Sequence, residues 1–490
     1  MKSALLSQRL SSGVFLPVFS LPSPYGIGDL GPSARRFVDF LSEAGQRFWQ
    51  VLPVFRLPDG GANPYVPFSA SAGNILLISP DFLASEHLLD HPPSPLGEGR
   101  IDYGRVYRYK LEIFRKAFSN FRTTPEYEEF CAENVEWLED YASFAVLCRA
   151  FGTPWNQWPV RPGEGARREV RERWGKEMEF EKFLQYLFFR QWFELKEHGQ
   201  SRGVQLVGDL PFCFPYQSAE VWLYQRLFKL DGQGNPTFFS GVPPDVFSRV
   251  GQFWGTPVYN WEEHRRERFK WWIGRIGRAL RLFDWVRLDH FRGFIRYWEI
   301  PAGRRPEEGR WERAGGADFF LELERRFGSP PLLAEDLGAL LPEEVGIIDG
   351  LGIPTIRVLL FALSQERVSG RHAPHEYPEN CVAYTSTHDS PTLMGWFESA
   401  GPSHRQSLFK YLGREVGTRE VPTECVKLLM SSRARVCIFP LHDLLGLGDE
   451  ARINRPGTVE GNWEWRVLPQ QLSPELVKTL RRLTVDFGRA

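Results

Sequence analysis

The 490-residue sequence has no apolar run that reaches the roughly 18 residues of a membrane span. Its first residues, MKSALLSQRL, interrupt their apolar positions with Ser7, Gln8 and Arg9, which argues against a secretory signal. It also lacks an excess of one charge, because the formal net charge is -1, and no global positive field attracts nucleic acid or anionic lipid. We therefore expect a cytoplasmic protein that binds neither nucleic acid nor membranes.

Cysteine is scarce as well. The six cysteines are Cys131, Cys148, Cys213, Cys381, Cys425 and Cys437, and they form no CxxC pair or zinc-like spacing. They are interpreted as reduced residues, and neither a metal nor another cofactor is expected. In contrast, 14% of the residues are aromatic and Gly and Pro number 45 and 37, which indicates many shaped loops. Most aromatic rings are expected to fill the core, but rings in loops suit a ligand such as a sugar.

Short, nearly continuous apolar runs recur along the chain, which is typical of parallel strands buried on both faces. The runs cover residues 13–19, 48–54, 74–79, 204–212, 284–291, 331–337, 355–362, 382–389 and 434–441. Segments with one apolar helical face precede several of them, for example residues 270–281. This alternation predicts an α/β fold, a (β/α)8 TIM barrel, which needs eight strands. One of the nine runs must then lie outside the barrel.

The spacing between the runs is uneven, which locates insertions. Residues from about 74 to 185 are expected to form a mostly helical subdomain, and residues from about 213 to 262 a loop-rich lid. The sequence contains no internal repeat and no low-complexity tract. We therefore expect residues 1–490 to form a single catalytic barrel that carries these insertions.

Four of the predicted strands finish in an acidic residue. The acids are Asp209, Asp289, Glu335 and Asp389. The C-terminal ends of barrel strands meet around one mouth, where the chemistry of such barrels takes place. A structural role, such as capping a helix, explains any one acid. For four together, next to His290, His388 and two arginines, a shared site is the better explanation.

Several carboxylates without a thiolate-rich or histidine-rich ligand set indicate acid/base chemistry without a metal. Cleavage of a glycosidic bond needs one protonated and one ionised carboxyl group. Arg287 shares a strand face with Asp289 and stabilises its negative charge, so Asp289 is the candidate nucleophile. Glu335 follows an apolar run and lies near another negative charge, which should raise its pKa and makes it the candidate acid and base. Asp389, beside His388, is expected to hold substrate hydroxyls or to offset positive charge.

Two motif matches are rejected as sites. GIGDLG at residues 26–31 matches GxGxxG but follows a turn and not a strand, and Pro32 after it is typical of a helix start. HEYPE at residues 375–379 lacks a second zinc-binding histidine and contains Pro378.

A set of longer motifs runs in order from about residue 12 to residue 466. They include SLPSPYGIGDLG, EAGQRFWQVLPV, GVPPDVFS, GQFWGTPVYNW, VRLDHFRGF, AEDLG, YPENCVAYTSTHD, LLGLGDEARINRPGT and EGNWEWR. In these motifs the chain resembles the 4-α-glucanotransferases, also called amylomaltases or disproportionating enzymes, of glycoside hydrolase family 77. The resemblance covers nearly the whole chain.

The resemblance implies retaining transfer of a segment of an α-1,4-glucan or maltooligosaccharide to the 4-hydroxyl of glucose or another glucan, through a covalent glycosyl-Asp intermediate. It implies a barrel without metal and without the C-terminal β-domain of α-amylases. The implied roles are nucleophile for Asp289, acid/base for Glu335 and transition-state stabiliser for Asp389. The implied sugar-binding residues are Tyr65, Asp209, Gln252, Trp254, Arg287, His290 and His388, with Asn454 at the border of the pocket. By this resemblance, residues 74–79 are the run outside the barrel.

Some residues depart from the family pattern. Val66 stands in NPYV where the family usually has SPYQ, and Ser390 and Pro391 follow Asp389 where it usually has Asn-Asp. Gln217 and His442 are further departures. They leave open the donor and acceptor preference and the balance of transfer and hydrolysis. A retaining α-glucan hydrolase and a catalytically lapsed glucan-binding protein remain as alternatives. The oligomeric state also stays open, and a monomer fits.

Overall fold

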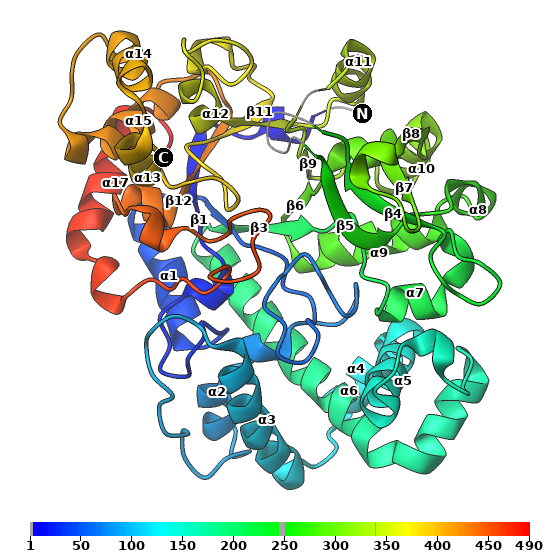
Figure 1. Cartoon of the computed structure of the whole chain (residues 1–490). Helices are drawn as coiled ribbons and strands as arrows, with labels where there is room; N and C mark the ends of the chain where they lie inside the picture. Colours follow the sequence, from blue (N-terminus) through cyan, green and yellow to red (C-terminus); the bar gives the residue numbers. More distant parts are fainter. Residues whose placement is uncertain (1–2, 245–249, 339) are drawn as a thin grey trace.

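The computed structural model describes residues 3–244, 250–338 and 340–490, and its centre is a closed barrel of parallel strands (Figure 1). The barrel strands are β1 Ser11–Phe15, β2 Phe48–Gln50, β3 Gln205–Leu210, β6 Trp285–Leu288, β9 Leu332–Ala334, β10 Thr355–Val358, β11 Cys381–Tyr384 and β12 Val436–Pro440. They follow one another around the barrel in chain order, and β12 closes onto β1. The predicted barrel is therefore confirmed. Residues 74–79 lie outside it, as expected, and contain the short 3-10 helix η3 Ile75–Leu77.

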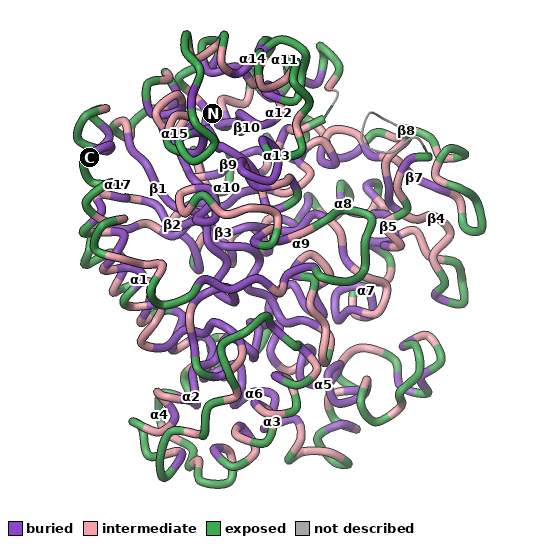
Figure 2. Tube along the Cα trace, turned by 60° about the vertical axis from the view of Figure 1, so that its left-hand side comes forward, coloured by how far each residue is buried: buried purple, intermediate pink, exposed green. Residues whose placement is uncertain are grey.

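The barrel strands are apolar along their length because both faces are covered. Every residue of β1, β2, β6, β9, β10, β11 and β12 is buried. Figure 2 shows these buried strands enclosed by segments whose exposed residues face outward. Strand β1 also needs a glycine, because a Cβ on Gly13 would lie 2.5 Å from the Cβ of Phe48 in β2. Continuous hydrophobicity thus follows from burial on two sides.

Helices surround the barrel. Those outside the first insertion are α1 Pro32–Glu43, α7 Ala219–Leu223, α8 Trp261–Arg266, α9 Lys270–Leu282, α10 Gly316–Phe327, α11 Pro342–Leu351, α12 Leu359–Leu363, α13 Leu393–Ser399, α14 Pro402–Leu412, α15 Val421–Met430, α16 Leu441–Leu444 and α17 Pro474–Asp486. Helix α1 begins at Pro32, as its sequence predicts. The last helix, α17, returns to the start of the chain, where the Thr484 hydroxyl accepts a hydrogen bond from Gln46 Nε2 at 2.8 Å.

A group of helices lies between β2 and β3, in the lower part of Figure 1. It comprises α2 Pro80–Ser85, α3 Tyr103–Asn120, α4 Pro125–Glu133, α5 Val135–Phe151 and α6 Glu164–Ser201. The boundary expected near residue 185 falls inside α6. The C-terminal half of this helix packs on the barrel, where Trp192 Nε1 donates to the carbonyl oxygen of Leu282 at 3.0 Å. One long helix therefore joins the insertion to the barrel.

A second, antiparallel sheet lies beside the barrel in the order β5-β4-β7-β8. Its strands are β4 Phe238–Val242, β5 Gln252–Pro257, β7 Arg296–Pro301 and β8 Arg310–Arg313. Strands β4 and β5 belong to the range expected for the lid, whereas β7 and β8 follow β6 and lie outside it. The segment 245–249 of the expected lid is outside the described residues. The lid sheet, β4, β5, β7 and β8, is therefore assembled from two separate stretches of chain.

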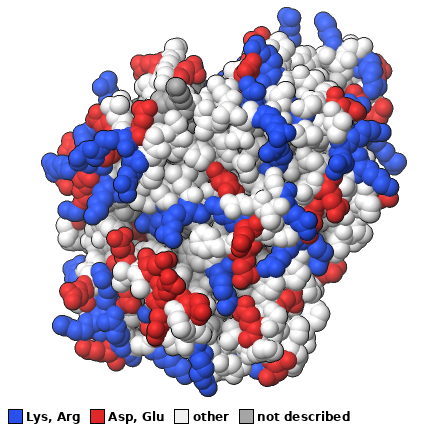
Figure 3. Space-filling model, turned by 180° about the vertical axis from the view of Figure 1, so that it is seen from behind, with Lys and Arg blue, Asp and Glu red and all other residues white. Residues whose placement is uncertain are grey.

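The surface carries both signs of charge. Figure 3 shows Lys and Arg interspersed with Asp and Glu over one face of the molecule, in keeping with the net charge of -1. None of the described helices has the length and apolar character needed to cross a membrane. The cysteines are free thiols.

Lys110 of α3 joins the helical insertion to the connection that precedes α1. Its fully buried Nζ donates to the carbonyl oxygens of Leu76 at 2.7 Å and Ile78 at 2.9 Å, and lies 3.8 Å from Asp29 Oδ2. Burial lowers the pKa of Lys110 to about 8, and the charge of Asp29 opposes this shift. The buried ion pair therefore depends on both partners being present.

We expect Lys110→Met to lower the free energy of unfolding by about 3 to 5 kcal/mol, because it leaves the carboxylate of Asp29 buried without its partner. Lys116→Met, in the same helix, is the control, since Lys116 pairs with Asp90 on the surface at 2.8 Å and should contribute at most about 1 kcal/mol. Urea unfolding of both variants measures the difference. Equal midpoints for the two variants would contradict the role of Lys110.

Candidate active site

Asp289 and Glu335 directly follow two neighbouring strands, β6 and β9. The last residues of these strands, Leu288 and Ala334, are partners in the parallel register. The Glu335 N–H donates to the Leu288 carbonyl at 3.1 Å, and the Glu335 carbonyl accepts from the N–H of Phe291 at 3.0 Å. Neighbouring strands are about 4.8 Å apart. The barrel therefore places the two carboxyl groups side by side at its C-terminal end.

Arg287 bonds to two carboxylates at this end of the barrel. Its Nη1 donates to both carboxylate oxygens of Asp209 at 2.7 Å and to Oδ1 of Asp289 at 3.0 Å. Asp209 is fully buried and also accepts from the hydroxyl of Tyr65 at 2.7 Å. The Asp289 side chain, in contrast, is 25% exposed. Asp209 thus orients Arg287 and Tyr65, while Asp289 faces the mouth with a cation beside it.

Glu335 has the raised pKa that its sequence context predicts. Its Oε2 accepts from the backbone N–H of His290 at 2.9 Å, and its Oε1 accepts from the N–H of Leu337 at 2.7 Å. Burial raises the pKa of Glu335 to about 7, with Arg287 opposing this shift and the charge of Asp289 adding to it. Near neutral pH, Glu335 can therefore both give and take a proton.

His290 links this carboxyl pair to the lid sheet. Its backbone is left-handed, with φ at 46°, and the chain turns there into the 3-10 helix η6 Phe291–Phe294. Its ring packs edge-to-face on Trp254 of β5 at 4.9 Å between centroids. Trp254 Nε1 in turn donates to Oε1 of Gln252 at 3.2 Å. Burial lowers the pKa of His290 to about 4, against the effect of Asp289, so the ring is neutral at neutral pH.

Asp389 lies on a loop beyond the end of β11, and its side chain is 49% exposed. Asn454 Nδ2 donates to Asp389 Oδ1 at 2.6 Å, and His388 Nε2 lies 3.3 Å from Oδ2. Partial desolvation by neighbouring protein atoms favours a higher pKa for Asp389. The positive charge of His388 and the hydrogen bonds from His388 and Asn454 outweigh this effect and lower the pKa to about 2. Asp389 is therefore ionised at neutral pH.

An aromatic stack joins Asp389 to the other carboxylates. The Tyr65 ring stacks on His388 at 5.2 Å with an interplanar angle of 16°, and its hydroxyl bonds to Asp209. Trp463 lies 6.0 Å from both rings between centroids. Through these contacts all residues predicted for the site belong to one connected group. The pKa of the Tyr65 hydroxyl is raised by burial and by Asp209, so it stays a donor.

Three residues of this region were not predicted. Trp463 stands in the motif EGNWEWR, but its place beside His388 depends on a positive φ of 65°, which the sequence does not reveal. The hydroxyl of Tyr384, at the end of β11, donates to Oε1 of Gln50 in β2 at 2.7 Å inside the barrel. The sequence could have indicated Gln50, because it is a polar residue within the apolar run 48–54 and such residues need a hydrogen-bond partner when buried.

The residues that depart from the family pattern do not replace a carboxylate of this group. Ser390 Oγ accepts from the N–H of Thr387 at 2.9 Å and so closes a turn next to Asp389. Gln217 accepts from the N–H of Trp155 at 3.2 Å, in the link to the helical insertion. Val66 is half-buried in the turn that follows Asn63. Nothing in the structure explains the choice of valine at this position.

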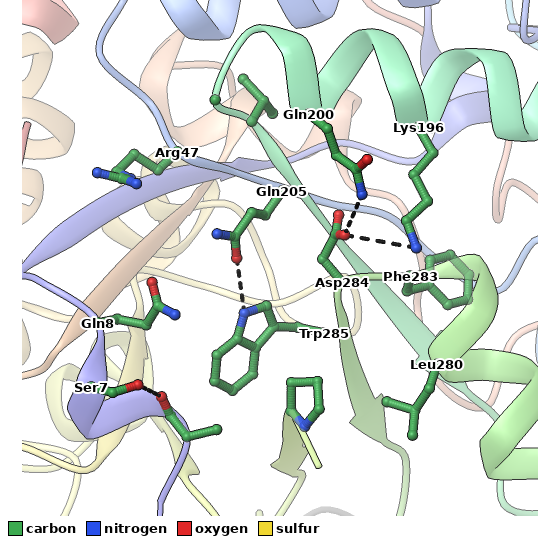
Figure 4. A pocket seen from close by; sticks show the side chains of 14 residues that line it. Ser7, Gln8, Arg47, Lys196, Gln200, Gln205, Leu280, Phe283, Asp284 and Trp285 are labelled. Atoms are coloured by element: carbon green, nitrogen blue, oxygen red, sulfur yellow. Dashed lines mark hydrogen bonds and ion pairs between the residues drawn. The ribbon is translucent and has the colours of Figure 1, made fainter. Parts of the chain in front are cut away.

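A cavity of about 580 Å³ lies at the opposite end of the barrel (Figure 4). It is lined at the N-terminal ends of β3 and β6 by residues that include Gln205, Asp284 and Trp285. The carboxylate of Asp284 accepts hydrogen bonds there from Gln200 Nε2 at 3.1 Å and from the N–H of Leu206 at 2.8 Å. This cavity is separate from the carboxylates at the C-terminal ends. In the three described ranges, no group of three or more His, Cys, Asp or Glu residues is arranged to hold a metal ion.

Comparisons with known proteins agree over almost the whole chain. A family model described as 4-alpha-glucanotransferase matches residues 16–471. The 4-alpha-glucanotransferase of Aquifex aeolicus is 46% identical over 98% of this chain and 99% of its own length, and that of Thermus thermophilus is 44% identical over 96% and 97%. The solved structure of amylomaltase from Streptococcus agalactiae in complex with acarbose is 33% identical, with a TM-score of 0.94 and coverage of 99% of this chain and 100% of that chain.

We expect Arg287→Met to lower the free energy of unfolding by about 3 to 5 kcal/mol, because Asp209 then stays buried without its cation. The double variant Arg287→Met with Asp209→Asn should regain part of this loss, since it removes the uncompensated charge. Arg173→Met is the control, because the Arg173 pair with Glu169 lies on the surface. Urea unfolding measures all three variants. A double variant less stable than Arg287→Met would contradict this account.

Proposed function

This chain belongs to the 4-alpha-glucanotransferase family, and on that premise we propose that Asp289, Glu335 and Asp389 catalyse its transfer reaction by a retaining mechanism. The observation that supports these roles most directly is the pair Asp289 and Glu335. Retaining glycosidases hold their two carboxyl groups about 5 to 5.5 Å apart. Neighbouring strands are separated by a similar distance, and these two residues occupy equivalent positions after β6 and β9.

In the first step, protonated Glu335 gives its proton to the glycosidic oxygen of the donor glucan. An oxygen of Asp289 attacks the anomeric carbon, the bond to the glycosidic oxygen breaks, and the leaving chain departs with a new 4-hydroxyl. The donor segment is then an ester of Asp289. Arg287 stabilises the carboxylate of Asp289 before attack, and ionised Asp389 offsets the positive charge that develops on the sugar ring.

In the second step, the 4-hydroxyl of an acceptor glucose or glucan enters next to Glu335. The carboxylate of Glu335 takes its proton, the acceptor oxygen attacks the anomeric carbon, and Asp289 leaves as a carboxylate. Glu335 ends the cycle protonated, and two displacements retain the configuration at the anomeric carbon. With a pKa of about 7, Glu335 populates both forms that the two steps require.

The groups around the carboxylates suit a neutral sugar. Tyr65, His388 and Trp463 provide ring faces on the side of Asp389, and Trp254 provides one on the side of Glu335. Such surfaces match the apolar faces of a glucose ring. Water in place of the acceptor hydroxyl would give hydrolysis by the same residues. Trp254 brings the lid sheet into contact with His290, so the lid sheet influences whether water or a glucan reaches the intermediate.

Maltotriose alone, without added metal, should be converted into glucose together with maltopentaose and longer chains, which separation by chain length detects. Asp289→Asn should abolish this conversion, because it removes the nucleophile. Asp284→Asn is the matched control, since Asp284 lies at the other end of the same strand, and it should retain activity. Glucose and maltose alone would instead establish a hydrolase. Glucan binding without products would support a lapsed enzyme.

The value of kcat/KM should fall as pH rises through about 7, tenfold for each further pH unit, because the first step needs Glu335 protonated and its pKa is about 7. The value falls and does not rise because the protonated form of Glu335 disappears above its pKa. With α-maltosyl fluoride as donor the leaving group needs no proton, so Glu335→Ala should keep its glycosylation step far better than with maltotriose. A pH profile flat up to pH 9 would contradict the role of Glu335.

A further inference from the structure

The loop 385–392 carries Asp389 and is not part of the barrel sheet. Strand β11 ends at Tyr384 and helix α13 begins at Leu393, so Asp389 lies in the middle of the connection. Asp289 and Glu335, in contrast, directly follow a strand and keep the hydrogen bonds of the sheet. The position of the third carboxylate must therefore be set by contacts outside the sheet.

Asp443 of α16 bonds to both ends of this loop. Its Oδ2 accepts from the hydroxyls of Thr385 and Ser386, each at 2.6 Å, and its Oδ1 accepts from the N–H of Leu393 at 2.8 Å. Thr385 and Ser386 begin the loop, and Leu393 is the first residue of α13 directly after it. Asp443 is fully buried, as are Thr385, Ser386 and Leu393. One carboxylate therefore fixes the distance between the two ends of the loop.

Asp443 itself has a rigid base. Helix α16 directly follows β12, and β12 pairs with β11 on one side and with β1 on the other. A buried carboxylate is costly unless it is hydrogen-bonded, and its three bonds to a single loop offset this cost. The neighbouring basic group is His442, whose Nε2 lies 3.7 Å from Oδ1. Burial lowers the pKa of His442, which favours its neutral form.

The following segment holds the outer side of the same loop. Asp449 Oδ1 accepts from the N–H of Thr392 at 3.3 Å, and Arg452 Nη2 donates to the carbonyl oxygen of Asp389 at 2.9 Å. The approach of Asp449 requires a glycine in α13, because a Cβ on Gly395 would lie 2.3 Å from Oδ1. Residues 441–454 therefore support the loop along its length, with Asp443 at the inner end.

We propose that Asp443 is a positioning residue for the transfer reaction and that it holds Asp389 where positive charge develops in the transition state. This inference rests on the role of Asp389 proposed above. Asp443 does not touch the reacting atoms and acts through Thr385, Ser386 and Leu393. A shift of Asp389 would weaken an interaction made mainly in the transition state, so it should lower kcat more than it raises KM.

The test is Asp443→Asn, which keeps the shape of the side chain and removes the negative acceptor. With maltotriose as substrate, kcat should fall about 10- to 100-fold, because small misplacements of a catalytic group have effects of this size. KM should change by less than about threefold. The affinity for 1-deoxynojirimycin, a cationic sugar mimic, should fall in step with kcat. Near-UV circular dichroism and urea unfolding show whether the variant is folded.

Two further variants serve as controls. Asp140→Asn changes a buried carboxylate of α5 that bonds to Arg167 at 2.8 Å, and it should reduce stability without changing kcat or inhibitor affinity. Ser386→Ala removes one donor from the loop side and should lower kcat in the same direction but less. Combined with Asp443→Asn, its effect should be smaller than the product of the two single effects, since both act on one contact.

A folded Asp443→Asn variant with unchanged kcat would overturn the inference. Equal losses of affinity for maltotriose and for 1-deoxynojirimycin, with kcat unchanged, would overturn it too. If Asp443→Asn does not fold, Thr385→Val with Ser386→Ala carries the same test, and an unchanged kcat there overturns it too. Asp389→Asn is measured in parallel. Loss of activity in Asp389→Asn alone rejects the role of Asp443, whereas full activity in Asp389→Asn rejects the proposed role of Asp389 itself.

Discussion

The buried guanidinium of Arg287 is the interaction on which the mouth of the barrel depends. Asp209 lies near the end of β3, and Asp289 and Glu335 directly follow the adjacent strands β6 and β9, so their negative charges repel one another. Arg287 bonds to two of them and opposes the rise in pKa of the third. The carboxylate of Asp209 compensates the positive charge of Arg287 and also accepts a hydrogen bond from the hydroxyl of Tyr65. Without a cation at this position, holding these carboxyl groups together would cost several kcal/mol or require one of them to be protonated.

The three carboxyl groups assigned to catalysis differ because their surroundings differ. Burial raises the pKa of Glu335, and its two hydrogen bonds come from backbone N–H groups that cannot move away. Asp289 has the guanidinium of Arg287 beside it and a side chain that reaches the mouth. Asp389 has a lowered pKa because of His388 and Asn454. Similar chemical groups can thus serve as acid, nucleophile and fixed charge in one site.

The barrel and its strand-end acids could be predicted because both depend on local sequence. Strands buried on two faces are continuous apolar runs, and an acid at the end of such a run is visible at once. The run 74–79 shows the limit, since its apolar character alone does not distinguish η3 from a strand. The pairing of β4 with β7 joins distant segments, and the position of Trp463 depends on its positive φ. Neither has a local signal.

Distance from the nearest strand decides what a catalytic side chain needs from the rest of the fold. The position of a residue directly after a strand is fixed by the backbone hydrogen bonds of the sheet. Asp389 lies within a loop, so its position depends on hydrogen bonds with α16 and with the segment after it. The departures Ser390 and Pro391 fall in this loop. Ser390 closes a turn on Thr387, and the ring of Pro391 restricts φ, so both stiffen the loop from within. Internal stiffness and the external bonds to Asp443 therefore act on the same quantity, the position of the third carboxylate.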